Sequence, residues 1–157
     1  MKVLYLHGLN STNINDRTHW LSQYAQVINP LMQYDNIPES YKYLEKLVLK
    51  HKPDLIIGSS MGGFLAYHLG NYYGIPTILL NPALVMKMIV KPDNRIFPVK
   101  NTHYIAIGKE DDVVPSVTTK ALLEEDRVNH FIKEYDRGHE TPLEDFIEIC
   151  KFSGYFE

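Results

Sequence analysis

Residues 55–66 read Leu-Ile-Ile-Gly-Ser-Ser-Met-Gly-Gly-Phe-Leu-Ala, a short apolar run followed by small residues and then a helix-like stretch. The small residues form the pattern Gly58-x-Ser60-x-Gly62. A serine at a sharp turn between a strand and a helix projects its hydroxyl above the sheet. Only very small neighbours tolerate the close approach of strand and helix at such a turn, which accounts for both glycines. The stretch therefore predicts a nucleophile elbow with Ser60 at its tip.

Other glycine motifs fit this stretch less well. Gly58 and Gly63 have the spacing of a phosphate-binding loop, but Phe64 stands where that loop requires lysine. The stretch also lacks the Gly-x-Gly of a dinucleotide-binding fingerprint. A bare Gly-x-Ser-x-Gly pattern also occurs by chance, so an ordinary structural turn is the alternative interpretation of Ser60.

Strand-like and helix-like runs alternate along the whole chain. The expected strands are Lys2–Leu6, Leu31–Tyr34, Asp54–Gly58, Thr77–Leu80, His103–Ile107 and His130–Tyr135. The expected helices are Asp16–Ile28, Glu39–Lys50, Met61–Tyr73, Ser116–Glu125 and Pro142–Lys151. Most strand candidates are almost continuously apolar, which is typical of parallel strands covered on both faces. Strict alternation with short connections predicts a doubly wound α/β sheet.

The least regular stretch is Asn81–Thr102, which contains three prolines. We expect a short helix and a loop over the sheet there. The stretch is too short for a folded cap domain, and a small flap is the alternative. No linker interrupts the alternation, so residues 1–157 are expected to form a single domain without a separate cap.

Composition narrows the class of protein. The chain has 157 residues, 45% hydrophobic and 22% charged, with 16 basic and 19 acidic residues. This balance gives no cationic footprint for nucleic acid or for an anionic membrane. No apolar run approaches the ~18 residues of a membrane span, and the apolar start at Lys2–Leu6 is too short for a signal peptide. The single cysteine, Cys150, fits a reducing compartment, so we expect a cytoplasmic protein.

A serine nucleophile needs a base, and histidine is the usual one. In this kind of fold the order along the chain is serine, acid, histidine, which leaves four candidates downstream of Ser60: His68, His103, His130 and His139. His68 falls inside a predicted helix, and His103 and His130 lie near the starts of strands. Only His139 follows a strand, at the edge where catalytic groups gather. We therefore expect His139 to be the base, and a solvated loop histidine is the alternative.

The acid that orients the histidine should follow the preceding strand. Glu110, Asp111 and Asp112 all stand there. One carboxylate would accept the second N–H of the histidine and stabilise the imidazolium. Spacing alone leaves the choice among the three open, and at least two of them are solvated residues of an acidic turn.

An oxyanion hole completes the predicted site. One donor is the N–H of Met61, the residue after the nucleophile. The loop after the first strand supplies the second, for which we choose the N–H of Leu9, with Gly8 permitting the tight turn. His7 is expected to be a buried, hydrogen-bonded support for this loop and not a second base.

These motifs, taken together, resemble those of a known superfamily. In order along the chain they are Leu6-His7-Gly8, Gly58-x-Ser60-x-Gly62-Gly63, Gly108-x-x-Asp111-x-x-Val114-Pro115 and Gly138-His139. They are similar to the successive motifs of the α/β-hydrolase superfamily, and most of all to its small, cap-less bacterial esterases of the YqiA-like kind. The resemblance places the acid on Asp111, with Asp112 as the alternative. It also implies a minimal α/β-hydrolase fold: a three-layer sandwich of about six mostly parallel strands in order 2-1-3-4-5-6, with flanking helices.

The resemblance implies a serine hydrolase that cleaves carboxylic esters or thioesters through an acyl-enzyme on Ser60. Neither a cofactor nor a metal is expected, and the partner would be a small-molecule acyl ester or thioester. The chain would be a monomer or a small homo-oligomer. The short Asn81–Thr102 stretch implies an open, weakly selective site. Two alternatives are a non-catalytic binding or regulatory protein on the same scaffold and an acyltransferase using the same residues.

Overall fold

Strands and helices alternate through the computed structural model, which describes residues 1–90 and 101–157. The strands are β1 (Lys2–Leu6), β2 (Gln26–Ile28), β3 (Leu55–Ser59), β4 (Thr77–Leu80), β5 (Thr102–Gly108) and β6 (Asn129–Tyr135). The helices are α1 (Asp16–Leu21), α2 (Ile37–His51), α3 (Met61–Tyr73), α4 (Ser116–Asp126) and α5 (Leu143–Phe152), with a 3₁₀ helix, η1, at Leu84–Met88. Proline and glycine mark two of the helix ends, with Pro38 in the first turn of α2 and Gly74 capping α3 at φ 68°.

The strands form one sheet in the order β2-β1-β3-β4-β5-β6, and every neighbouring pair is parallel. This confirms the predicted strand order. From β1 the chain first adds β2 on one side of the sheet, and it then adds β3, β4, β5 and β6 in turn on the other side. The strand order therefore reverses at β1 and β3, and ligand sites of open α/β sheets lie outside the carboxyl ends of strands at such a point.

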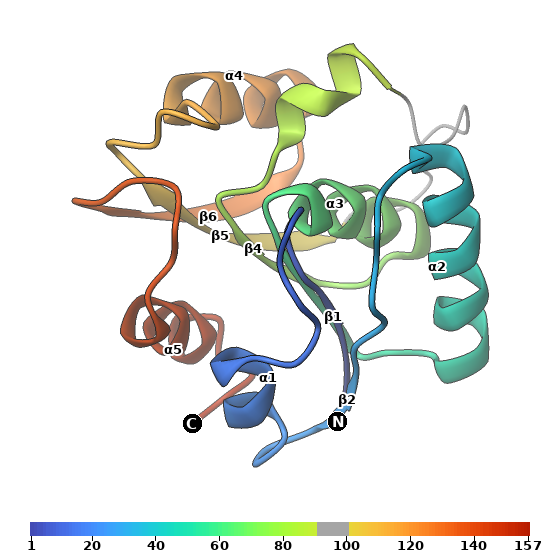
Figure 1. Cartoon of the computed structure of the whole chain (residues 1–157). Coiled ribbons are helices and arrows are strands. Elements are labelled where there is room, and N and C mark those ends of the chain that lie inside the picture. Colours follow the sequence, from blue (N-terminus) through green and yellow to red (C-terminus); the bar gives the residue numbers. More distant parts are fainter. Residues whose placement is uncertain (91–100) are drawn as a thin grey trace.

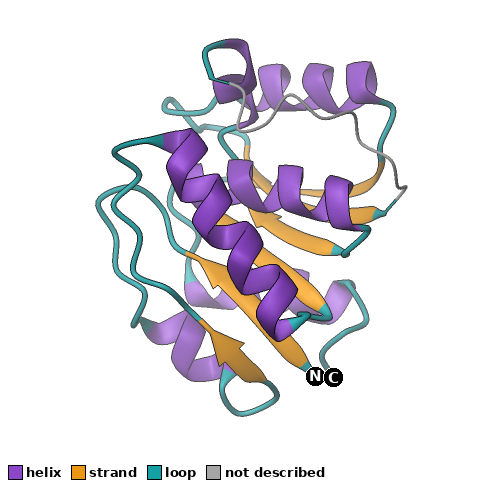
Figure 2. Cartoon of the chain, turned by 90° about the vertical axis from the view of Figure 1, so that its right-hand side faces the viewer, coloured by secondary structure: helices purple, strands orange, loops and turns teal. Residues whose placement is uncertain are grey.

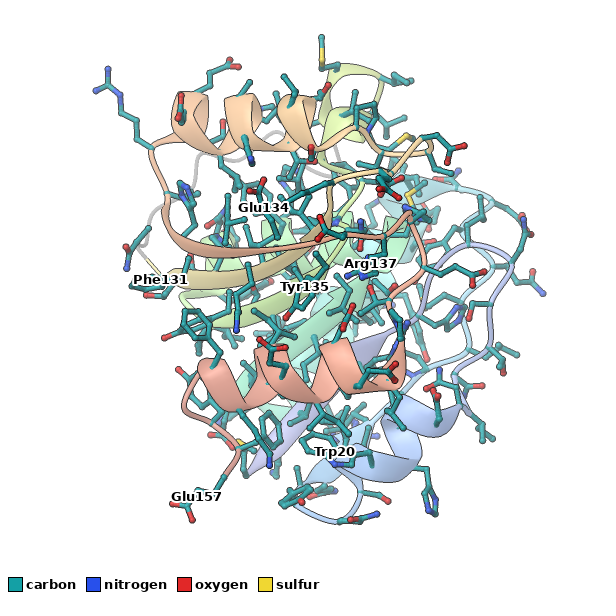
Figure 3. The ribbon with its side chains drawn as sticks, turned by 90° about the vertical axis from the view of Figure 1, so that its left-hand side faces the viewer. Trp20, Phe131, Glu134, Tyr135, Arg137 and Glu157 are labelled. Carbon is teal, nitrogen blue, oxygen red and sulfur yellow. The ribbon has the colours of Figure 1, made fainter. Side chains whose placement is uncertain are left out.

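Helices cover both faces of the sheet, which confirms the three-layer sandwich. Helices α1 and α5 lie on one face, and α2, α3 and α4 lie on the other (Figure 1; Figure 2). Alternate residues of each strand point to opposite faces. Leu4 and Leu6 belong to the core under α2 and α3, whereas Val3 and Tyr5 belong to the core under α1 and α5. Figure 3 shows the same alternation on β6, with Glu134 toward α4 and Tyr135 toward α5.

The second strand is not where the sequence pattern placed it. Helix α1 ends at Leu21 instead of Ile28, and Gln26–Ile28 pairs with β1. Leu31–Tyr34, predicted as a strand, forms no strand, and Tyr34 has a left-handed φ of 61°. Leu31 is exposed, whereas Met32 and Tyr34 are buried in the core under α2 and α3 and form hydrogen bonds to His7. The apolar character of this short run therefore reflects partial burial and does not indicate pairing with a neighbouring strand.

The stretch Asn81–Thr102 begins as predicted with a short helix, the 3₁₀ turn η1 beside α3 and α4. The predicted loop and the alternative of a flap fall largely on residues 91–100, outside the described residues. Within the described part of the chain, no helix has the length and apolar character needed to cross a bilayer.

Candidate active site

Ser60 occupies the turn between β3 and α3 with φ 52° and ψ −111°, a conformation that L-residues rarely adopt. Three backbone hydrogen bonds hold it there. The Ser60 N–H donates to the carbonyl of Leu80 at 2.9 Å, and the Ser60 carbonyl accepts from Ala83 at 2.9 Å and from Phe64 at 3.0 Å. The ends of β4 and α3 thus fix the strained backbone, and the hydroxyl stands at the carboxyl end of the sheet.

The flanking glycines are required by backbone contacts. A Cβ on Gly58 would lie 2.4 Å from the carbonyl oxygen of Gly62, and one on Gly62 would lie 2.3 Å from that of Leu6. Real Cβ atoms do not approach oxygen so closely. The close approach of β3 and α3 that the motif predicted is therefore present, and Gly62 also allows α3 to lie close to β1.

The side chains of Ser60, His139 and Asp111 form a hydrogen-bonded chain. The distance from Ser60 Oγ to His139 Nε2 is 2.9 Å, and the distance from His139 Nδ1 to Asp111 Oδ2 is 2.7 Å. A carboxylate only accepts, so His139 Nδ1 carries a proton and Nε2 accepts from the Ser60 hydroxyl. The structure thus brings together the three side chains that the sequence analysis singled out.

Backbone pairing beyond the ends of β5 and β6 brings Asp111 to His139. The Lys109 N–H donates to the Tyr135 carbonyl at 2.9 Å, and the Glu110 N–H donates to the Arg137 carbonyl at 3.0 Å. The loop before His139 lies so close to β5 that a Cβ on Gly108 would be 2.1 Å from the Gly138 carbonyl oxygen. Gly108 is therefore needed for this approach.

Asp111 is buried, with four hydrogen bonds to its carboxylate. Oδ1 accepts from the backbone N–H groups of Val113 at 2.9 Å and Val114 at 2.8 Å, and Oδ2 accepts from His139 and Asn81. Burial alone would raise the pKa of Asp111, but the bonds from Val114, His139, Asn81 and Val113 outweigh it and hold the pKa below its ordinary value. The carboxylate is therefore kept ionised.

The other two carboxylates of the acidic turn do not reach the site. Glu110 and Asp112 are both exposed. Neither makes a hydrogen bond to His139 in the described part of the chain, so the geometry agrees with the resemblance in selecting Asp111.

Two residues that the sequence analysis missed, Asn81 and Arg137, hold the Asp111 carboxylate in place, Asn81 directly and Arg137 through Asn81. Asn81, at the end of β4, is buried and donates from Nδ2 to Asp111 Oδ2 at 2.8 Å. Its Oδ1 accepts from Arg137 Nη1 at 2.8 Å and from the Thr141 hydroxyl at 3.2 Å. Arg137 in turn pairs with Asp145 at 2.8 Å and lies over the Tyr135 ring, on the sheet face that α5 covers (Figure 3). For Asn81, the signal available in the sequence was the Asn81-Pro82 pair directly after the predicted strand Thr77–Leu80.

The predicted oxyanion donors flank Ser60. Met61 begins α3, and the first N–H groups of a helix have no partner within it. Gly8 lies against Ser60, because a Cβ built on Gly8 would be 3.6 Å from the Ser60 Cβ. Gly8 and Leu9 line a pocket of ≈ 340 Å³ together with Ser60 and His139. Both donors thus belong to elements that border the serine hydroxyl.

His7 is a support for this loop, as expected. Its ring is buried, with Nδ1 donating to the Gly8 carbonyl at 2.7 Å and Nε2 accepting from the Met32 N–H at 2.8 Å. Both ring nitrogens are occupied, so His7 is held away from base chemistry. His103 and His130 lie at the amino ends of β5 and β6, the edge of the sheet opposite Ser60.

The sheet order, the strained serine turn and the ordered Ser–His–Asp chain define a small member of the α/β-hydrolase superfamily. Within it, the chain belongs to the uncharacterised protein family UPF0227, whose family model matches residues 2–94. This confirms the resemblance to YqiA-like α/β-hydrolases that the motifs indicated.

Solved structures share the fold at low sequence identity. A carboxylesterase from Bacillus cereus is 18% identical, with a TM-score of 0.66 over 98% of this chain and 88% of that one. A protein from Xanthomonas campestris assigned to the α/β hydrolase superfamily is 14% identical, with a TM-score of 0.70 over 98% and 95% of the two chains. A SOBER1 variant from Arabidopsis thaliana is also 14% identical, with a TM-score of 0.70 over 99% and 97%. These similarities show the fold.

Proposed function

We propose that the chain is a serine hydrolase that cleaves carboxylic esters or thioesters through an acyl-enzyme on Ser60. The observation that carries this proposal is the continuous hydrogen-bonded chain from Ser60 Oγ to His139 Nε2 at 2.9 Å and from His139 Nδ1 to Asp111 Oδ2 at 2.7 Å. Ser60 and His139 line a pocket, so a substrate carbonyl has access to the Ser60 hydroxyl.

In the first half of the reaction, Ser60 Oγ attacks the acyl carbonyl carbon while its proton passes to His139 Nε2. Asp111 stabilises the resulting imidazolium without accepting its proton. The tetrahedral intermediate then collapses, the bond to the leaving oxygen or sulfur breaks, and His139 Nε2 returns the proton to that leaving group. The acyl group is left on Ser60.

In the second half, a water molecule attacks the acyl carbon and gives its proton to His139 Nε2. The new tetrahedral intermediate releases the acid, and Ser60 Oγ takes the proton back. In both halves the carbonyl oxygen becomes negatively charged, and the N–H groups of Met61 and Leu9 are the proposed donors to it. Removing one such donor typically costs about 10²–10³-fold in turnover.

Names of proteins with the same fold support this reaction class. The Bacillus cereus structure is that of a carboxylesterase, and another solved structure with a TM-score of 0.69 is that of an esterase. Because these proteins are 18% and 14% identical to this chain, they support the ester chemistry and leave the substrate open.

The test combines turnover with covalent labelling. The wild-type protein should hydrolyse a short-chain 4-nitrophenyl ester and carry one fluorophosphonate adduct on the peptide that contains Ser60. Ser60→Ala should lose both. Ser22→Ala is the matched control, because Ser22 is exposed beyond the end of α1 and should keep both properties.

Each alternative has its own outcome. A wild-type protein that neither turns over esters nor takes the label contradicts the proposal and favours a binding protein on this scaffold. Labelling of Ser60 with acyl transfer to an added alcohol or amine, but no hydrolysis, favours the acyltransferase. Equal labelling of wild type and Ser60→Ala would place the nucleophile elsewhere.

A further inference from the structure

The pocket beside Ser60 has two walls from distant parts of the sequence. One wall is the segment after β1, and it contributes Gly8, Leu9, Asn10, Ser11 and the side chain of Arg17. The other consists of residues 59–60 and residues 139–141. At ≈ 340 Å³ the pocket lies near the small end of ligand sites, which span about 300–1,000 Å³. A small acyl compound would contact both walls.

Arg17 is held in this pocket by neutral groups. Its Nη2 donates to the Thr141 carbonyl at 2.6 Å, and its Nη1 lies 3.3 Å from the Tyr5 hydroxyl. The guanidinium carbon lies 5.9 Å from the ring centroid of Phe146. These contacts fix the guanidinium, yet they use only part of its five N–H donors and bring no negative charge to it.

The charge of Arg17 lacks a carboxylate partner within the described residues. The acidic residue among those that line the pocket, Glu140, is exposed and forms no ion pair with Arg17 in the described part of the chain, whereas Arg17 is half-buried. By contrast, the similarly half-buried Arg137 pairs with Asp145 at 2.8 Å. Burying a guanidinium without an anion costs free energy, and an anionic ligand would remove that cost. Among the described residues lining the pocket, Arg17 provides the only guanidinium or ammonium group.

From this arrangement we propose that Arg17 binds an anionic group of the substrate, so that the preferred substrates are small esters or thioesters carrying a carboxylate or phosphate. The inference rests on the proposed function, because it places that anion in the pocket where Ser60 attacks. A guanidinium binds such groups through two parallel hydrogen bonds, which adds orientation to attraction. Arg17 would then set both the selectivity and the position of the scissile carbonyl.

The test compares anionic and neutral esters of equal size. For a charge on the alcohol side the pair is 4-acetoxybenzoate and 4-acetoxybenzamide. For a charge on the acyl side the pair is monomethyl adipate and the methyl ester of adipic acid monoamide. In Arg17→Gln, kcat/KM for the anionic member of at least one pair should fall about 10- to 100-fold, since a hydrogen bond to a charged group is lost. The neutral member should change less than about twofold, and Arg17→Lys should fall in between.

A control variant separates a local effect from the overall charge. Arg127→Gln removes one positive charge from the exposed end of α4 and should leave both members of each pair unchanged. An equal fall for anionic and neutral esters in Arg17→Gln would overturn the inference, because it would mean that Arg17 only supports the Thr141 carbonyl. No change for either anionic ester would overturn it as well. Should Arg17→Gln fail to fold, Arg17→Lys alone decides the test, through the ratio of kcat/KM for the anionic ester to kcat/KM for its neutral counterpart.

The outcome also separates this inference from the proposed function. Hydrolysis of the neutral esters that depends on Ser60, with no effect of Arg17 on the anionic ones, defeats only the inference. If the wild type leaves all four esters intact and Ser60 takes no fluorophosphonate label, the proposed function fails and the inference fails with it.

Discussion

Asn81 and Asp111 stand on loops after neighbouring strands, and Asn81 Nδ2 donates to Asp111 Oδ2 at 2.8 Å. That same oxygen accepts the His139 Nδ1–H at 2.7 Å. The orientation of the Asn81 amide is fixed, because its Oδ1 accepts from Arg137 and Thr141. A single buried amide therefore controls the position of the oxygen that His139 contacts.

Replacing Asn81 should slow turnover with little change in KM. Asn81→Asp places a second carboxylate beside Asp111 and should lower kcat about 10- to 100-fold on a neutral 4-nitrophenyl ester, since like charges disturb the ionised acid. Asn81→Gly keeps the positive φ of 42° and should cost about tenfold through the lost hydrogen bond. Asn129→Asp, at the far end of β6, is the control. An unchanged kcat in Asn81→Asp would contradict this role.

The acidic turn offers a matched pair of substitutions. Asp111→Asn should lower kcat by about 10⁴-fold, because the amide cannot hold the His139 tautomer that accepts from Ser60. Asp112→Asn should leave kcat within about twofold, because Asp112 is exposed. Steady-state hydrolysis of one ester by the three proteins decides the matter. The reverse order of losses would move the acid to Asp112.

Adding one methyl group at Gly108 should damage both stability and activity. The new Cβ would lie 2.1 Å from the Gly138 carbonyl oxygen, so the loop that carries His139 must move away from β5. We expect a loss of about 1–3 kcal/mol in the free energy of unfolding and a large fall in kcat. Gly138→Ala is the control, because its nearest neighbour, the Glu110 carbonyl oxygen, would be 3.8 Å away. Urea unfolding and ester turnover of both variants measure the difference, and equal effects would contradict this explanation.

His103 should make the protein less stable in mild acid. Burial, and then the neighbouring His130, lower the pKa of His103 from 6.5 to about 3. Between these values the unfolded chain binds a proton that the folded one does not. The stability contributed by neutral His103 is therefore complete above pH 6.5 and is lost as pH falls toward 3, by about 1.4 kcal/mol per pH unit.

His103→Gln tests this through urea unfolding at about pH 7 and about pH 5. The variant should lose less stability than the wild type between these two conditions, because the buried group no longer titrates. His19→Gln should behave like the wild type, since His19 is exposed. The same loss in His103→Gln as in the wild type would show that other groups carry the acid sensitivity.

The sequence predicted those elements that a local pattern defines. Five strands and the helices bounded by proline, glycine or the serine turn lie within a few residues of their predicted positions. The second strand was misplaced because Gln26–Ile28 and Leu31–Tyr34 are similarly short and apolar. Their difference is the pairing of Gln26 with Lys2 across the sheet, a long-range contact that no local pattern carries.

The site divides in the same way. Ser60 could be singled out from its motif, and His139 from the serine–acid–histidine order along the chain and its place after the last predicted strand, whereas Asp111 needed the family resemblance. Asn81 and Arg137 escaped notice, because their importance lies in contacts between residues 30 and 56 positions apart in the chain.

The two residues of the Ser60–His139 hydrogen bond follow strands that differ in the number of neighbouring strands. β3, which leads to Ser60, has a strand on each side, whereas β6, which leads to His139, ends the strand order of the described sheet. A strand at the edge of a sheet separates from it more readily than a central strand, since the backbone groups along one of its sides have no hydrogen-bond partners in a neighbouring strand. Amides of β6 should therefore exchange with deuterium before those of β3. On heating, ester turnover should disappear at a lower temperature than the circular dichroism of the helices, so that inactivation reports the detachment of one strand and not the unfolding of the molecule.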